Sequence, residues 1–346
     1  MSRKRASPGV VGGGGGAARS GSGGARESAG RGTEAARVAL LAKRLAAPGA
    51  SGVGVGIGDD AAVLDPVDGS LVWTIDAQVD GTHFRMAWLG WEDVGWRSFM
   101  AAASDLAAMG ATPVAALSAL TLADDVDDAA LDALARGQAD AARAVSAPVV
   151  GGNLARGRET SITTTLLGRA ERPVLRSGAR EGDGVYLAGA VGMAAAGLLA
   201  LERGAHLGDP SVDACVDAWR RPRALVERGL AMRGLASAAV DVSDGLACDA
   251  GHLAEASAVT LLFDERLLRA RAGDALERAA ALLGRDLLDM LVHGGGEDYA
   301  LLVTSPSPIE GFDRVGVVEG DGPGVSLLRI DGARTAVDPR GFDHFG

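Results

Sequence analysis

The chain has 346 residues and a net charge of −11, with 45 acidic against 34 basic side chains. This excess of acid argues against nucleic acid or an anionic membrane as the main partner, and the length is typical of two domains. The two cysteines, Cys215 and Cys248, belong to no CxxC or His-paired pattern, which argues against a disulfide scaffold or structural zinc.

The first 32 residues form a leader rich in Gly, Arg and Ser, with few large apolar side chains. Such a segment buries too little apolar surface to offset its ordering entropy, so we expect disorder. It lacks the apolar centre of a secretory signal, and no run in the chain approaches the ~18 apolar residues of a membrane span. A soluble, cytoplasmic protein is expected, with either an inert leader or a basic arm that contacts phosphate.

Strand and helix patterns alternate through the first half of the chain. Thr33 can cap a helix whose apolar residues recur at helical spacing. A strand is expected at 70–76, and the helical pattern after it ends at Gly110 because Pro113 prevents its continuation. The remaining elements are a strand at 114–122, a helix at 124–146, and strands at 147–153 and 160–170 that flank a glycine turn.

The second half also mixes strands and helices, without a repeat of fixed period. Its elements are a strand at 184–190, a helix through 198–202, a strand and helix joined by the acidic turn 241–246, a strand at 259–264, and a glycine turn entering a strand within 293–304. The chain is therefore predicted to be an α/β or α+β protein of two unequal units. We expect a leader at 1–32, an N-terminal domain at 33–170 and a C-terminal domain at 171–346.

Short acidic clusters set among small or apolar residues are the main functional signal. They read GIGDDAAV at 56–63, TIDAQVDGTHF at 74–84, SDLAAMGA at 104–111 and DVSDGL at 241–246. Carboxylates in such surroundings are costly unless a positive charge compensates them. Mg²⁺ is usually held by one or two carboxylates together with substrate phosphates, so the clusters predict magnesium and polyphosphate chemistry.

Each cluster alone has a plainer explanation. Asp59 and Asp60 fit a solvated turn, and Asp76 is no more specific by itself. Asp244 can cap the helix that follows it, although a helix N-terminus also attracts phosphate. Asp105 is the more informative residue, because it lies in the middle of an apolar helix, where Asp is unfavourable.

One further segment bears on phosphate binding. GGNLARG at 151–157 can present backbone N–H groups and Arg156 to an anion. A Walker A string and the protein-kinase motifs are absent, so any phosphate site uses another architecture. His83 lies beside the acidic residues, although a lone His is more often structural.

Taken in order, the motifs resemble the thiamine-monophosphate kinases, a family of the aminoimidazole ribonucleotide synthetase superfamily. GIGDDAAV, DGTHF, SDLAAMGATP, LRSGAREGD, DVSDGLACDAGHL, GGEDYALL and the final GFDHF carry the resemblance, which covers Thr33 to Phe345. It implies the two-domain fold of that superfamily, with N-terminal domains paired across a homodimer axis. It also implies Mg²⁺-dependent transfer of the γ-phosphoryl group of ATP to thiamine monophosphate, and no partnership with nucleic acid or membrane.

The resemblance also implies a role for individual residues. The implied magnesium ligands are Asp59, Asp60, Thr74, Ile75, Asp76, Asp105, Asn153, Asp241 and Asp244. The implied ATP contacts are Gly152, Asn153, Arg176 and Ser243. The implied thiamine-phosphate contacts are His83, Glu297 and Phe342.

This chain departs from the family pattern at two of these positions. Asn153 stands where the family usually has Asp, so one ligand charge is lost, although Asn still offers a carbonyl oxygen. Ile75 stands where the family often has Thr, which leaves only a backbone oxygen. Both changes bear on the number or affinity of metal ions more than on the reaction.

The implied reaction needs no acid or base from the protein. A phosphate monoester has a second pKa near ~6, so its oxygen is already ionised at neutral pH. The alternatives are aminoimidazole ribonucleotide synthetase and a nucleotide-binding homologue that has lost catalysis. Superfamily members that use a catalytic cysteine in the leader or at the C-terminus fit poorly, because neither segment contains Cys.

Overall fold

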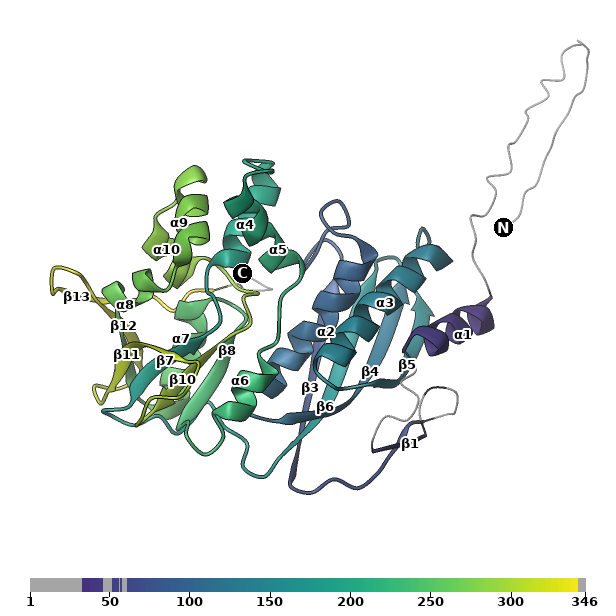
Figure 1. The fold of residues 1–346 in the computed structure, drawn as a ribbon, viewed down its shortest axis with the longest axis horizontal. Coiled ribbons are helices and arrows are strands. Elements are labelled where there is room, and N and C mark those ends of the chain that lie inside the picture. Colours follow the sequence, from purple (N-terminus) through teal and green to yellow (C-terminus); the bar gives the residue numbers. More distant parts are fainter. Residues whose placement is uncertain (1–32, 46–51, 56, 58–60, 342–346) are drawn as a thin grey trace, which may run out of the picture.

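The computed structural model describes residues 33–45, 52–55, 57 and 61–341 (Figure 1). The described residues form a four-stranded sheet and a seven-stranded sheet that lie side by side, together with a small two-stranded sheet (Figure 1). The leader, about which we expected disorder, lies outside the described residues. Within them, no helix is both long and apolar enough to cross a membrane.

The first sheet has four strands in the order β3-β6-β4-β5, so β3 and β5 are its edges. The pair β4 and β5 is parallel, and the other pairs are antiparallel. Helices α2 and α3 cover one face, and α1 packs on α3. The bounds are α1 Glu34–Leu45, β3 Ser70–Val79, α2 Trp91–Ala108, β4 Thr112–Leu122, α3 Asp128–Ala144, β5 Val149–Arg156 and β6 Ser161–Ala170, with a small hairpin of β1 Val53–Val55 and β2 Val63–Leu64 before them.

The second sheet has seven strands in the order β13-β12-β9-β11-β7-β10-β8. Its strands are β7 Gly184–Ala188, β8 Ala238–Val242, β9 Thr260–Asp264, β10 Ala300–Ser305, β11 Asp313–Glu319, β12 Gly324–Leu328 and β13 Arg334–Ala336. Its helices are α4 Met193–Arg203, α5 Pro210–Arg220, α6 Val226–Ala231, α7 Leu246–Ser257, α8 Glu265–Ala270, α9 Gly273–Leu282 and α10 Leu287–His293. The predicted mixture of helices and strands in two units is therefore confirmed.

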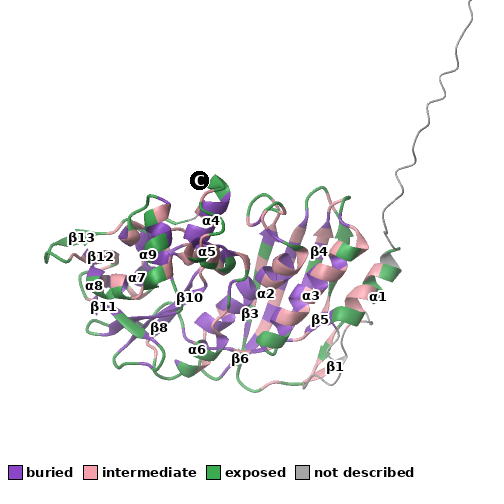
Figure 2. Cartoon of the chain, turned by 45° about the horizontal axis from the view of Figure 1, so that its top comes forward, coloured by how far each residue is buried: buried purple, intermediate pink, exposed green. Residues whose placement is uncertain are grey.

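Helix α2 joins the two halves of the molecule. It packs on its own sheet and also contacts α6 and β8 of the other half. The backbones meet closely, since a Cβ added to Gly229 of α6 would lie 2.1 Å from the carbonyl oxygen of Ala107. Figure 2 shows buried residues concentrated in α2, α3, β8 and β10. One apolar core thus runs between the sheets, and it holds them in a definite relation.

The alternation of side chains along β3 places the residues with predicted roles on the face toward α2, apart from Ile75. Val72, Thr74, Asp76 and Gln78 face α2, while the residues between them face away from it. The strand continues three residues beyond the predicted end at Asp76, to Val79, because it pairs with β6 along its whole length. This extension brings Gln78 into the sheet beside Asp76.

The sequence suggested a glycine turn at 151–153, but this segment belongs to a strand. Gly151, Gly152 and Asn153 lie inside β5, opposite Leu117, Ser118 and Ala119 of β4. A Cβ added to Gly152 would lie 1.9 Å from the carbonyl oxygen of Ser118. The glycine is needed for this close approach of two strands, and a side chain there would force them apart.

Candidate functional site

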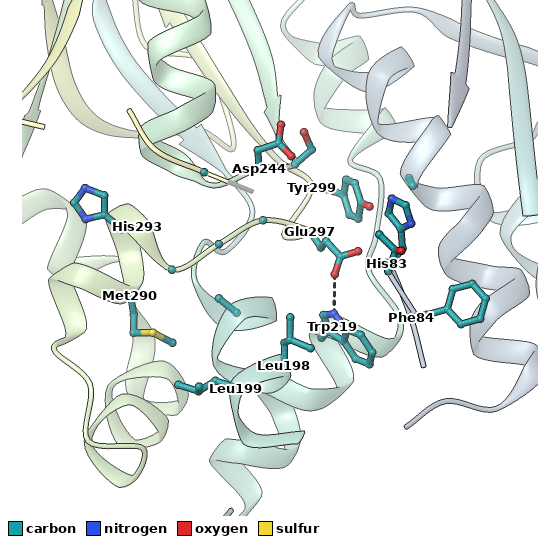
Figure 3. Close-up of a pocket in the computed structure, with 18 of the residues that line it drawn as sticks. His83, Phe84, Leu198, Leu199, Trp219, Asp244, Met290, His293, Glu297 and Tyr299 are labelled. Atoms are coloured by element: carbon teal, nitrogen blue, oxygen red, sulfur yellow. Dashed lines mark hydrogen bonds between the residues drawn. The ribbon is translucent and has the colours of Figure 1, made fainter. Parts of the chain in front are cut away.

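A cleft of about 1110 Å³ lies between the two halves of the molecule (Figure 3). Strand β3, the loop after it and helix α2 form one wall; α4, α5, α10 and the loops before α7 and β10 form the other. It collects seven residues with predicted roles, which are Asp76, His83, Asp105, Asp241, Ser243, Asp244 and Glu297. Asp76 and Glu297, which are 221 positions apart in the sequence, thus line the same cleft.

Three aspartates at one end of the cleft come from three elements. Asp105 of α2 accepts a hydrogen bond from the hydroxyl of Thr74 on β3. The preceding helical residue, Ser104, donates to Asp241 of β8 at 2.7 Å. Asp76 accepts from Gln78, two residues along β3, at 3.0 Å. Asp105 lies in the last turn of α2, not in the middle of a helix as the sequence suggested, and its contact with Thr74 places it between the two sheets.

Burial makes these carboxylates hard to ionise. It raises the pKa of Asp76, and it raises the pKa of Asp105, where the negative charge of Asp76 adds to the effect. Burial raises the pKa of Asp241 to about 7, with a further contribution from the charge of Asp105. Arg176 is a nearby cation that opposes these shifts. Several acids with so little compensating charge form a site that favours a cation.

The donor set is made of oxygen atoms, which suits Mg²⁺ rather than a soft metal. Within the described part of the chain, no three His, Cys, Asp or Glu side chains lie close enough together to hold a metal ion by themselves. The predicted ligands Asp59 and Asp60 lie outside the described residues, as does the predicted substrate residue Phe342.

A residue that the sequence reading missed shapes the acidic turn after β8. The carboxylate of Asp249, buried in the first turn of α7, accepts the backbone N–H groups of Ser243, Asp244 and Gly245 at 2.9 to 3.1 Å. Asp249 therefore holds the turn from which Asp244 enters the cleft. Burial raises the pKa of its carboxyl to about 7. The signal in the sequence was an acidic residue at the start of a helix.

The other part of the cleft contains an ion pair and aromatic rings. Glu297 pairs with Arg97 of α2 and accepts a hydrogen bond from the indole N–H of Trp219 at 2.7 Å (Figure 3). His83 lies beside Glu297, and its Nδ1 accepts the backbone N–H of Val79 at 3.1 Å. The apolar side chains of Leu198, Leu199 and Met290 line the far end. Arg97 and Trp219 were also missed, because their partners are distant in the sequence.

The remaining predicted residues lie outside this cleft. Gly152 and Asn153 are exposed on β5, at the opposite edge of the sheet from β3. The side chain of Ile75 is on the outer face of β3. Arg176 is exposed in the loop before β7 and does not line the cleft, although its positive charge acts on Asp105 and Asp241. The roles of these four residues stay predictions.

Comparisons with known proteins show which family this chain resembles. Residues 58–170 match the model of the AIR synthase related protein N-terminal domain, and residues 180–314 match that of the C-terminal domain. The thiamine-monophosphate kinase of Aquifex aeolicus is 33% identical over 84% of this chain and 92% of its own length. That of Escherichia coli strain K12 is 34% identical over 85% of this chain and 92% of its own length.

The chain belongs to the thiamine-monophosphate kinase family.

Solved structures of this family have the same fold. The structure described as AaThiL complexed with AMPPCP and TMP is 32% identical, with a TM-score of 0.74 over 90% of this chain and 97% of that one. The thiamine-monophosphate kinase of Stenotrophomonas maltophilia K279a is 31% identical, with a TM-score of 0.73 over 86% of this chain and 95% of that one. The resemblance and fold class inferred from the motifs are confirmed.

Proposed function

We propose that this protein uses ATP to phosphorylate thiamine monophosphate, giving thiamine diphosphate. The observation that carries the proposal is the cleft, in which Asp76, Asp105, Asp241 and Asp244 lie together with the substrate candidates His83 and Glu297. A family member in complex with AMPPCP and TMP supports ATP as the co-substrate and thiamine monophosphate as the acceptor. The enzyme is thus a phosphotransferase whose acceptor is a phosphate group.

The chain's residues act mainly by positioning two anions. The acceptor phosphate is ionised at neutral pH, because its second pKa is near ~6, so no general base is required. Ser243 and Arg176 are proposed to contact ATP, with Gly152 and Asn153. His83 and Glu297 are proposed to hold thiamine monophosphate, together with Phe342. The indole of Trp219, which lines the cleft beside Glu297, offers a ring face to the cationic thiazolium.

We also propose that the acidic residues hold Mg²⁺. Asp76, Asp105, Asp241 and Asp244, with the hydroxyl of Thr74, supply the oxygen ligands that this ion prefers, and Asp59, Asp60, Asn153 and the backbone oxygen of Ile75 are proposed to complete the set. The fit is supported by the raised pKa of Asp241, which reflects buried negative charge without an adequate partner. When bound, Mg²⁺ neutralises phosphate oxygens and lowers the repulsion between the two anions.

The assembly that we propose is a homodimer in which each chain has two domains, 33–170 and 171–346, after the leader 1–32. The outer face of β3 supports it, because Leu71, Trp73 and Ile75 are 60%, 73% and 67% exposed there. A row of large apolar side chains on an open sheet face is typical of an interface. The resemblance to the superfamily also implies that the N-terminal domains pair across the dimer axis.

The direct test is turnover by the purified full chain with Mg²⁺, ATP and thiamine monophosphate. We expect thiamine diphosphate as the product. Asp244→Asn should lower kcat by about 100-fold or more, because it removes charge from the proposed metal site. Asp140→Asn, on the solvent side of α3, is the matched control and should keep wild-type turnover. ATP binding without product would refute the kinase proposal and favour a binding-only homologue.

A further inference from the structure

Arg97 is a buried cation at the boundary between the two halves of the molecule. It belongs to α2, and its side chain is only 1% exposed. Burial of a guanidinium costs several kcal/mol unless its charge and donors are satisfied. In the sequence, Asp93 lies four residues before Arg97 at the spacing of a helical ion pair, but in the structure Asp93 pairs with Arg221. The partners must therefore come from elsewhere in the fold.

The partners of Arg97 come from both halves. Its Nη2 pairs with the carboxylate of Glu297 and donates to the carbonyl oxygen of His83 at 3.2 Å. Its Nη1 donates to the carbonyl oxygen of Trp219 at 2.7 Å, and the guanidinium lies 4.6 Å from the centre of the Trp219 ring. One side chain of α2 thus holds two residues of the other half, both of which line the cleft.

Glu297 lies in a segment that needs such support. Its φ is +69°, and that of Tyr299 is +49°, values that cost energy in residues with a side chain. The segment is fastened to the end of β8 by hydrogen bonds from Glu297 N–H to Ser243 O at 2.8 Å and from Tyr299 N–H to Val242 O at 2.9 Å. The carboxylate itself is fastened by Arg97 and Trp219.

The contacts of Arg97 continue to the acidic cluster through Gln78, which is 2% exposed. Arg97 Nε donates to Gln78 Oε1 at 3.3 Å, and Gln78 Nε2 donates to Asp76 Oδ1 at 3.0 Å. The guanidinium of Arg97 has donors only, and ionised Asp76 has acceptors only. The side-chain amide of Gln78 must therefore turn its oxygen toward Arg97 and its nitrogen toward Asp76. An unbroken series of polar contacts thus joins Asp76 to Glu297 through Gln78 and Arg97.

We propose that Gln78 and Arg97 are positioning residues that set the Asp76 carboxylate and the Glu297 carboxylate relative to each other across the cleft. This inference rests on the proposed function, in which Asp76 acts at the metal and Glu297 at the acceptor. The two anions must be held in line for transfer, so an error at either carboxylate lowers the rate. Gln78 and Arg97 are proposed to act through these two carboxylates, to which each is joined by a side-chain contact.

The kinetic test uses Gln78→Met, Arg97→Lys and the double variant. Met matches Gln in length but cannot hold Asp76, and Lys keeps the charge but cannot reach all the partners of the guanidinium. We expect each single change to lower kcat/KM for thiamine monophosphate by about 10- to 100-fold, as removal of an orienting residue commonly does. The double variant should lose less than the product of the two factors, because the residues act as one unit.

The control is another buried glutamine of the same half of the molecule. Gln138 of α3 is fully buried and donates to Ser118 at 2.8 Å, but it does not line the cleft. Gln138→Met should therefore lower the melting temperature while keeping wild-type kcat and KM. Equal kinetic losses in the Gln78 and Gln138 variants, or losses that multiply in the double variant, would overturn the proposal.

A second readout needs neither metal nor turnover. In the metal-free protein, hydrogen exchange at the amides of Glu297 and Tyr299 should be faster in Arg97→Lys than in the wild type, with the centre of β10 unchanged. Uniformly faster exchange would show a merely structural role and contradict the inference. If the wild type makes no thiamine diphosphate, the kinase proposal fails, while the exchange data still decide whether Arg97 holds the Glu297 segment.

Discussion

The two faces of β3 differ in chemistry although they belong to one strand. The inner face carries Thr74, Asp76 and Gln78, which meet α2 and the cleft. The outer face carries Leu71, Trp73 and Ile75, which are exposed in the single chain. A strand has a side-chain period of two, so alternate residues are assigned to separate surfaces. The strand can therefore supply ligands on one side and, as we propose, an interface on the other.

The comparison also explains why Ile75 replaces a polar residue without disturbing the acidic cluster. Its side chain points away from Asp76 and Asp105, and its backbone pairs with Thr165 of β6. An apolar side chain is suited to a covered face of the sheet. The loss of a hydroxyl at this position is thus a change to the outer surface.

The largest expected effect is the loss of kcat when a residue on the inner face of β3 is substituted. Asp76→Asn removes one charge from the cluster and should lower kcat by about 100-fold or more, since the lost stabilisation of phosphate charge amounts to several kcal/mol. Steady-state kinetics over a range of Mg²⁺ concentrations measures the change. Ala77→Ser, on the outer face one residue along, is the control. Wild-type kcat in Asp76→Asn would remove this residue from the site.

Substitutions on the outer face of β3 should change the oligomeric state. The double variant Trp73→Lys, Ile75→Lys places charges in the proposed interface, where they cannot pair, and should shift a dimer to the monomer in sedimentation or light scattering. Leu207→Lys provides a matched control, because Leu207 is exposed on the turn before α5 in the other half. A wild-type protein that is already monomeric would contradict the proposed role of this face.

A smaller effect is expected in the pH dependence of stability. Burial raises the pKa of Asp241, Asp249 and Asp298 to about 7, so the folded protein holds protons that the unfolded chain has released. Without metal, the melting temperature should fall by about 2 °C or more as the pH rises from about 5.5 to about 8. Calorimetry in a chelator checks this, and added Mg²⁺ should recover stability at the higher pH. A melting temperature that rises over this range would contradict the burial of these acids.

Sequence reasoning identified most of the residues that line the acidic end of the cleft. Asp105 was conspicuous because Asp is unfavourable inside a helix, and Asp241 and Asp244 because they join a buried strand to a helix. Arg97 was missed because its partners Trp219 and Glu297 are distant in the sequence, and Gln78 because its contact with Arg97 depends on the fold. Asp249 was missed although its partners lie only four to six residues before it. The glycine segment at 151–153 was misread as a turn, because glycine also occurs where two strands approach closely.

The sequence by itself determined most helices and strands of the first half, the family, and the chemistry of the acidic clusters, because these depend on local periodicity and on residue type. Only the tertiary structure decided that α2 would bring Asp105 to Thr74 and Arg97 to Glu297, at separations of 31 and 200 residues. The physical reason is that buried polar groups must find partners, and the packing of two sheets around one helix determines which partners are within reach.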